Sequence, residues 1–106
     1  MPNFLLAYHG GEALPETQDA VDALMASWQS WFEALGADVV DGGNPVGQSC
    51  TLHSDGNIEP HGGSNPISGY SIISAKDLAD AQQKAAGCPV LQEEGGTIEL
   101  APIVEM

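Results

Sequence analysis

Hydrophobic residues recur at intervals of three and four between residues 18 and 35, which is the clearest pattern in the chain. This spacing predicts an amphipathic helix with one broad apolar stripe. Thr17 suits the N-cap, because its hydroxyl can accept from a free backbone amide, and Gly36 suits the C-cap. The stripe consists of Val21, Leu24, Met25, Trp28, Trp31, Phe32 and Leu35.

A second helix is predicted over residues 75–86, with Ser74 as its N-cap and Gly87 just after its end. Its apolar face is rich in alanine, so it should lie close against its neighbours. Aliphatic and β-branched runs predict strands, and Gly, Pro and Asp-Gly-Asn clusters predict the turns between them. The predicted strands are 3–9, 37–41, 48–54, 69–74 and 97–104. A loop is predicted at 12–16, a turn at Asp55-Gly56-Asn57, and a loop or an irregular edge at 57–65.

This order of elements predicts a single α+β domain over residues 1–106, with a ferredoxin-like βαββαβ plan and an extra hairpin. In that plan two helices cover one face of an antiparallel sheet. Three of the strands nevertheless place apolar neighbours on both faces, as in Leu5-Leu6, Val39-Val40 and Ile72-Ile73. The uncovered face needs a partner, and a second copy of the same sheet is the simplest one, so a homodimer is expected.

The charge balance narrows the choice of partners. The chain has 15 acidic residues and two basic ones, Lys76 and Lys84, and its formal net charge is -13. Such a surface repels phosphate backbones and anionic lipid, so neither nucleic-acid nor membrane binding is expected. A small-molecule ligand should therefore be neutral or cationic. The alternative is that the acidic surface only keeps the protein soluble.

Two cysteines, Cys50 and Cys88, are too few for a disulfide framework and lie in no C-x-x-C motif. Without a segment resembling a signal peptide, a cytoplasmic location with reduced thiols is expected. His53, Asp55 and His61 are loosely spaced and match no zinc pattern, so they are interpreted as a polar loop. No metal and no cofactor is predicted.

Several segments, taken in order, resemble one known family. They are Phe4-Leu5-Leu6-Ala7-Tyr8, Trp31-Phe32-Glu33-Ala34-Leu35-Gly36-Ala37, Asp41-Gly42-Gly43-Asn44-Pro45, Gly69-Tyr70-Ser71-Ile72-Ile73, Ala75-Lys76-Asp77-Leu78-Ala79-Asp80-Ala81, Gly87-Cys88-Pro89-Val90-Leu91 and Gly95-Gly96-Thr97-Ile98-Glu99. This set resembles the YCII-related family, also called the DGPF-domain family, over nearly the whole chain. The resemblance implies a dimeric α/β barrel of two ferredoxin-like protomers, with a cleft suspected of holding an active site.

The chain departs from that family at positions associated with chemistry. Some relatives carry a His–Asp pair with the His on the first helix, where this chain has Trp28 and Trp31. Residues 61–66 replace the Asp-Gly-Pro-Phe stretch, and Leu100-Ala101 stands where many relatives have an arginine. The resemblance therefore implies the scaffold rather than a catalytic residue.

Asp41 and His53 are the predicted catalytic pair, because a carboxylate that orients an imidazole makes a general base near neutral pH. The alternative is that Asp41 bonds the backbone of its own turn and that His53 is exposed at an edge. Tyr8, His9, Trp31 and Glu99 are predicted to bind a ligand. For Tyr8 and Trp31 the alternative is a place in the core, and for His9 and Glu99 it is contact with water.

Two functions follow from these residues. The first is an uncharacterised small-molecule enzyme or binding protein with a cleft in the dimer barrel, where Glu99 faces the barrel if Ile98 and Leu100 face the helices. Its chemistry would be proton transfer, with His53 as base and Asp41 as its orienting group. The second is a non-catalytic dimeric interaction or regulatory module.

Overall fold

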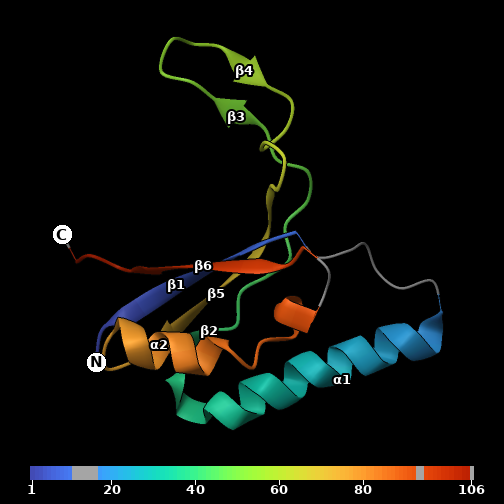
Figure 1. Ribbon diagram of the computed structural model, residues 1–106, viewed down its shortest axis with the longest axis vertical. Helices are drawn as coiled ribbons and strands as arrows, with labels where there is room; N and C mark the ends of the chain where they lie inside the picture. The colour runs from blue at the N-terminus through green and yellow to red at the C-terminus, as the bar shows by residue number, and fades with distance from the viewer. Residues whose placement is uncertain (11–16, 93–94, 106) are drawn as a thin grey trace.

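A four-stranded antiparallel sheet in the order β2-β5-β1-β6 forms the centre of the molecule (Figure 1). In this computed structural model the described residues are 1–10, 17–92 and 95–105. The strands of the sheet are β1 (Asn3–His9), β2 (Val39–Asp41), β5 (Ile67–Ser74) and β6 (Thr97–Pro102). The helices are α1 (Gln18–Leu35) and α2 (Leu78–Ala85), with 3-10 turns η1 (Gly36–Asp38) and η2 (Pro89–Gln92).

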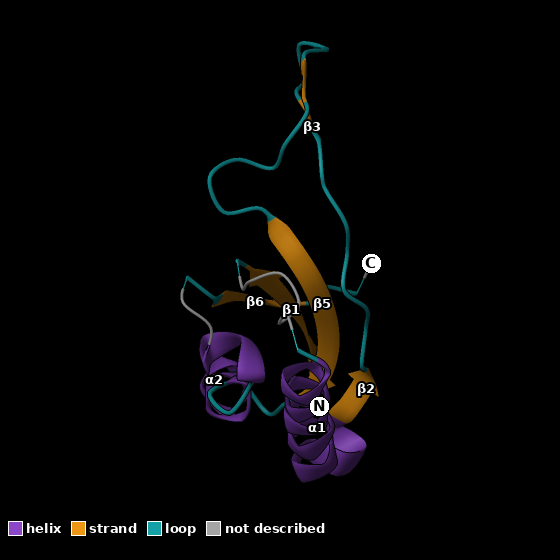
Figure 2. Ribbon diagram, turned by 90° about the vertical axis from the view of Figure 1, so that its right-hand side faces the viewer, coloured by secondary structure: helices purple, strands orange, loops and turns teal. Residues whose placement is uncertain are grey.

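Both helices lie on the same side of this sheet (Figures 1 and 2). Strand β1 is central and pairs antiparallel with β5 on one side and with β6 on the other. The arrangement is α+β and compatible with the predicted ferredoxin-like plan. The sheet is open, and nothing in the described part of the chain closes it into a barrel.

The predicted bounds and caps of α1 are confirmed. The Thr17 hydroxyl accepts from the Ala20 amide at 3.2 Å, and the Gly36 amide donates to the Phe32 carbonyl. Gly36 ends the helix with a φ of 57°, a left-handed conformation that glycine adopts without a steric penalty.

Helix α2 starts later than predicted, and the assignment of Ser74 as its N-cap is wrong. Ser74 is the last residue of β5 and pairs with Asn3, which keeps its backbone extended. The cap is Asp77, whose carboxylate accepts from the Asp80 amide at 2.8 Å. Ala81 and Ala85 face the sheet and are buried, so the alanine-rich face does bring the helix close.

The other strands differ from their predicted lengths. Residues 36–38 form η1, so β2 is shorter than the predicted 37–41, and β6 ends at Pro102 rather than at 104. The predicted 48–54 strand contracts to β3 (Thr51–Leu52), which pairs with β4 (Ile58–Glu59) across the predicted Asp-Gly turn. The loop predicted at 12–16 lies outside the described residues.

The core lies between the sheet and the helices. Phe4, Leu6 and Tyr8 alternate along β1 and point into it, where they meet Ile73 from β5 and Trp31 from α1. One polar relay crosses this core: the Tyr8 hydroxyl donates to Ser71 Oγ at 2.7 Å, and Ser71 Oγ donates to the Gly42 carbonyl at 2.8 Å.

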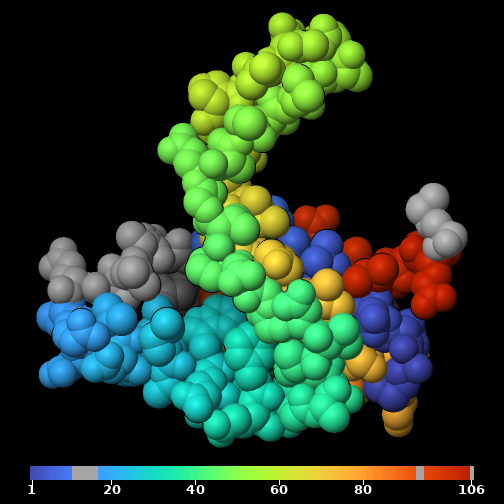
Figure 3. All heavy atoms as spheres, turned by 180° about the vertical axis from the view of Figure 1, so that it is seen from behind, coloured from blue at the N-terminus to red at the C-terminus, as the bar shows by residue number. Residues whose placement is uncertain are grey.

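Residues 46–66, with β3 and β4 near their tip, form a projection that is called the arm below. It rises from the side of the sheet opposite the helices (Figures 1 and 2). Figure 3 shows it standing clear of the body over most of its length. The radius of gyration is 15.0 Å, against about 13 Å for a compact chain of this length.

Candidate functional site

The sheet face without helices is called the open face below. Residues that point to it alternate with core residues along each strand. Register places Ala7 between Tyr70 and Glu99, and it places Leu5 between Ile72 and Ala101. The open face thus carries an apolar row of Leu5, Ile72 and Ala101 beside a polar row that contains Tyr70 and Glu99.

His9 completes the polar row at the end of β1. A bulge between Tyr8 and His9 breaks the register with β5, and bulges re-aim the side chains beside them. The His9 Nε2 atom lies 3.3 Å from Glu99 Oε1, and the two side chains are 25% and 75% exposed. Ninety positions separate these residues in the chain, and only the pairing of β1 with β6 brings them together.

The base of the arm fixes the orientation of the His9 ring. Its Nδ1 atom lies 3.0 Å from the Asn65 carbonyl oxygen. A carbonyl only accepts, so Nδ1 must carry the hydrogen and a neutral ring then has its lone pair on Nε2. A doubly protonated ring would instead donate to Asn65 and to Glu99 at once. Either form leaves Nε2 at the open face as the reactive position.

Tyr70 is held in a similar way by the other side of the arm base. Asn44 Nδ2 donates to the Tyr70 phenol oxygen at 3.5 Å. The phenol hydrogen is then free to donate to a bound molecule. Three polar groups therefore lie on the open face near the arm base, and together they form the candidate site. His9 and Glu99 are in contact, and Tyr70 lies across β1 from Glu99.

The structure does not bring the predicted catalytic pair together. Asp41 lies opposite Ile72 at the β2 edge of the open face, and its carboxylate accepts from the Gly43 amide at 2.8 Å. His53 lies on the arm, where its Nε2 is 3.5 Å from Glu59 Oε1. These are the turn and edge positions that the alternative interpretation described, and a pairing of Asp41 with His53 stays a prediction.

Of the four predicted ligand-binding residues, His9 and Glu99 meet in the candidate site, whereas Tyr8 and Trp31 lie in the core. Burial raises the pKa of Tyr8 above its ordinary value, since a phenolate is poorly solvated there. The Trp31 Nε1 donates to the Lys84 carbonyl at 3.0 Å. Their ligand-binding role is a prediction that their position in the core does not favour.

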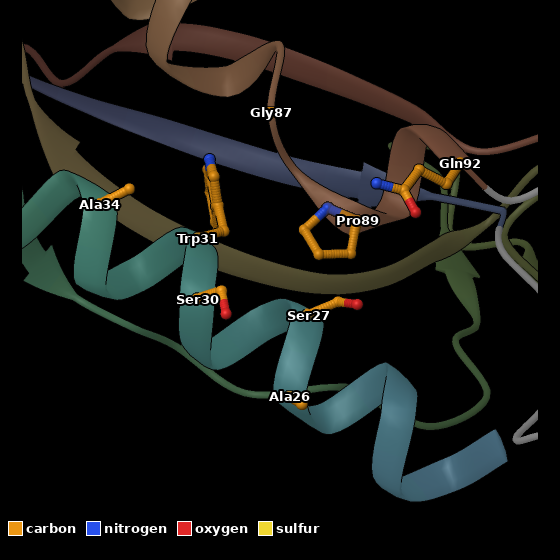
Figure 4. A pocket seen from close by; sticks show the side chains of 8 residues that line it. All are labelled: Ala26, Ser27, Ser30, Trp31, Ala34, Gly87, Pro89 and Gln92. Carbon is orange, nitrogen blue, oxygen red and sulfur yellow. The ribbon is translucent and has the colours of Figure 1, made fainter. Parts of the chain in front are cut away.

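Trp31 does line a shallow hollow between α1 and residues 87–92 (Figure 4). The other side chains around it are small or uncharged, including Ser27, Ser30 and Pro89. A second hollow beside Trp28 also follows α1. Both hollows are on the helix side of the sheet, away from His9 and Glu99, and among their described residues neither offers a base paired with an acid.

Positive charge is remote from the candidate site. Lys84 Nζ lies 3.1 Å from both Asp38 and Asp80, and these two carboxylates hold its pKa above the ordinary value against the opposing effect of burial. The described residues of the open face include no lysine or arginine, so the face favours neutral or cationic molecules. Among the described residues, no three His, Cys, Asp or Glu side chains gather as metal ligands would.

Sequence reasoning missed Tyr70 and Asn65. Tyr70 alternates with Ile72 in a predicted strand, so its place on the open face could have been read from that pattern. Asn65 acts through its backbone carbonyl and leaves no sequence signal.

Fold and site together define a small α+β protein with an ionisable cluster on an uncovered sheet face. No model of a known protein family matches the chain, and no curated protein shows significant similarity to it. Across the described residues, no helix has both the length and the apolar character needed to cross a bilayer.

Proposed function

We propose that the protein is a homodimer that binds a small neutral or cationic molecule at the corner between the open face and the arm base. The observation that carries this proposal is the His9–Glu99 pair, held on an uncovered sheet face without a nearby cation. The plan of the sheet is also consistent with membership of the YCII-related family, which we keep as part of the proposal.

Acid–base chemistry is available to this site. With Nδ1–H bonded to the Asn65 carbonyl, a neutral His9 ring presents the Nε2 lone pair and can take a proton from a bound molecule. The imidazolium that forms is stabilised by the Glu99 carboxylate, which is exposed enough to turn aside while the molecule binds. Tyr70 can donate its free hydroxyl hydrogen to an oxygen of that molecule. His9 thus takes the role that the sequence suggested for His53.

Ligand binding can be tested by native mass spectrometry of the purified protein, followed by thermal-shift screening with neutral and cationic small molecules. Glu99→Gln keeps the size of the side chain and removes its charge, so it should weaken binding of a cationic ligand about tenfold or more. Glu33→Gln, on the exposed side of α1, is the matched control. Binding that neither His9→Gln nor Glu99→Gln alters would refute this site.

The homodimer can be tested separately by sedimentation velocity. Ile72 lies in the middle of the open face, so Ile72→Lys should leave a folded monomer, whereas Met25→Lys on exposed α1 should remain dimeric. Because two chains of charge -13 repel each other, association should strengthen as salt is raised. A wild-type monomer at all concentrations, or an Ile72→Lys variant that dimerises normally, would contradict the proposed interface.

One observation favours the second candidate function, a non-catalytic dimeric interaction or regulatory module. Both hollows described above lie along α1 and not on the open face. If the two open faces pack without space between them, the dimer itself is the functional unit. In that case His9→Gln would leave every ligand measurement unchanged while Ile72→Lys would still abolish the dimer.

A further inference from the structure

We infer that the arm is a clasp that packs against a second copy of this chain and in doing so holds the candidate site closed. This inference rests on the homodimer proposed above and adds the surface that secures it. Three features support it: an apolar pair at the arm tip, the direction of the arm, and the surface area that the chain leaves exposed.

The apolar pair consists of Leu52 on β3 and Ile58 on β4. They are directly opposite each other in the two-stranded ladder, and they are 71% and 67% exposed. Because directly opposed residues share one face of a ladder, the two side chains form a single apolar patch. A two-stranded ladder is only marginally stable alone in water, so a covering surface is needed.

The arm nevertheless has a defined shape, which a docking element requires. The Thr51 hydroxyl donates to the His61 carbonyl at 2.8 Å, and the Gln48 amide donates to the Pro60 carbonyl at 3.1 Å. The turn is closed by the His53 amide, which donates to the Asn57 carbonyl at 2.8 Å. These bonds hold the two sides of the arm to each other along its length, so little order has to be gained on binding.

The direction of the arm places it beside any chain that covers the open face, and a second copy is such a chain. The arm rises from the same side of the sheet that the helices leave open (Figures 1 and 2). Any chain that packs on the open face must therefore lie alongside the arm. In a two-fold dimer built on the open faces, each arm would flank the body of the other copy.

The exposed area agrees with a dimer of this kind. The chain exposes 7044 Å², whereas a compact protein of its 11.0 kDa mass exposes about 5,600 Å². The excess is about 1,400 Å² per chain, or about 2,800 Å² for two copies, which is within the range of obligate homodimer interfaces. The arm and the open face together thus present enough surplus surface for a stable dimer.

The clasp is linked to the candidate site through the arm base. The Asn65 carbonyl that orients His9 and the Asn44 amide that bonds Tyr70 lie at the two points where the chain joins the arm. The Gly10 amide also donates to the Pro66 carbonyl there, at 3.5 Å. A partner that fixes the arm therefore also fixes the His9 and Tyr70 side chains through these bonds.

The decisive variant is Leu52→Thr/Ile58→Thr. Both side chains are exposed, and threonine is a β-branched residue that strands favour, so each copy should fold as the wild type does. Four apolar side chains would lose their cover in each dimer, and the dissociation constant measured by sedimentation should rise about 100-fold or more. Met25→Gln, another exposed apolar residue but on α1, should leave that constant within about twofold.

Cys50 provides a second measurement that does not depend on the double variant. It is exposed and lies on the arm two positions before Leu52, while Cys88 is buried and serves as an internal reference. Alkylation of Cys50 by iodoacetamide should slow about tenfold or more when the wild-type protein is concentrated from monomer to dimer. In the double variant and in Ile72→Lys it should stay fast at every concentration.

The outcomes separate this inference from the proposed function. The clasp is overturned, and the open-face dimer is left intact, by the following set of results. Ile72→Lys disrupts the dimer, the Leu52→Thr/Ile58→Thr variant dimerises with wild-type affinity, and Cys50 is alkylated fast in the wild-type dimer. A chain that is monomeric at all concentrations overturns both the clasp and the homodimer. Slowed alkylation together with a weakened double variant establishes the clasp.

Discussion

The relay from Tyr8 through Ser71 to Gly42 gives the sharpest test of how the core is held. It links β1, β5 and the end of β2 with two short hydrogen bonds, and both Tyr8 and Ser71 are buried. Buried polar groups stabilise a fold only while each has its partner. The losses in the free energy of unfolding of the two single variants and the double variant, ranked by size, therefore show whether these bonds exist in solution.

Removing the Tyr8 hydroxyl and removing the Ser71 hydroxyl should change the free energy of unfolding by different amounts. Tyr8→Phe removes one bond but lets Ser71 keep its bond to Gly42, so we expect a loss of about 1 kcal/mol in the free energy of unfolding. Ser71→Ala removes both bonds and leaves the buried Tyr8 hydroxyl with only the Cys88 thiol, a weak acceptor, beside it, for which we expect a loss of about 2 kcal/mol. In the Ser71→Ala background, Tyr8→Phe removes that hydroxyl and should cost nothing or restore up to about 1 kcal/mol.

Urea unfolding followed by tryptophan fluorescence is a suitable assay, because Trp28 and Trp31 pack on the core. All four proteins must be compared at one concentration, since association raises apparent stability. A loss of 1 kcal/mol should also lower the melting temperature by about 4–8 °C for a domain of this size. The reasoning fails if Tyr8→Phe destabilises the Ser71→Ala protein as much as it destabilises the wild type.

Two further predictions concern the thiols and one tight turn. Burial raises the pKa of the Cys88 thiol from 9.0 to about 11. The folded state therefore holds this proton to higher pH than the unfolded state does, and stability falls by up to about 1.4 kcal/mol per pH unit between about pH 9 and pH 11. Cys88→Ala should remove that part of the slope in urea titrations at several alkaline pH values, and exposed Cys50→Ala should retain it; equal slopes in both would refute this. Gly43 has a φ of 74°, and an added Cβ would collide with the Tyr70 carbonyl oxygen, so Gly43→Ala should lose about 2 kcal/mol or more. Gly47→Ala, with open space around it, should stay within about 1 kcal/mol of the wild type, and similar losses in the two variants would be contrary to this reasoning.

Features that depend on residues close together in the sequence could be predicted from it. The three- and four-residue spacing of apolar side chains fixes α1, and Thr17 and Gly36 fix its ends, because capping involves residues within one turn of each other. The apolar run in residues 3–9 likewise predicted a strand, although which of its residues face the core came from the structure. Competition between neighbouring elements was harder to foresee: Ser74 is a good capping residue, yet its pairing with Asn3 kept it in β5 and left the cap to Asp77.

The candidate site was predicted only in part. His9 was chosen for its chemistry at the end of a strand and Glu99 as a carboxylate among the apolar residues of the last strand, and the structure brings them within 3.3 Å. His53 was chosen as an imidazole that Asp41 could orient, but the length of the arm carries it away from Asp41. No local pattern in the sequence distinguishes these two cases.

The sequence by itself thus determined the bounds of α1, the existence of the second helix and of the strands, and the acidic composition. The tertiary structure decided which ionisable groups meet, because register between β1 and β6 is set by pairing across 90 residues rather than by local preference. It also decided the direction of the arm, which depends on how two extended segments leave the sheet at Asn44 and Asn65. Contacts between distant segments fix both features, and the candidate site and the clasp depend on them.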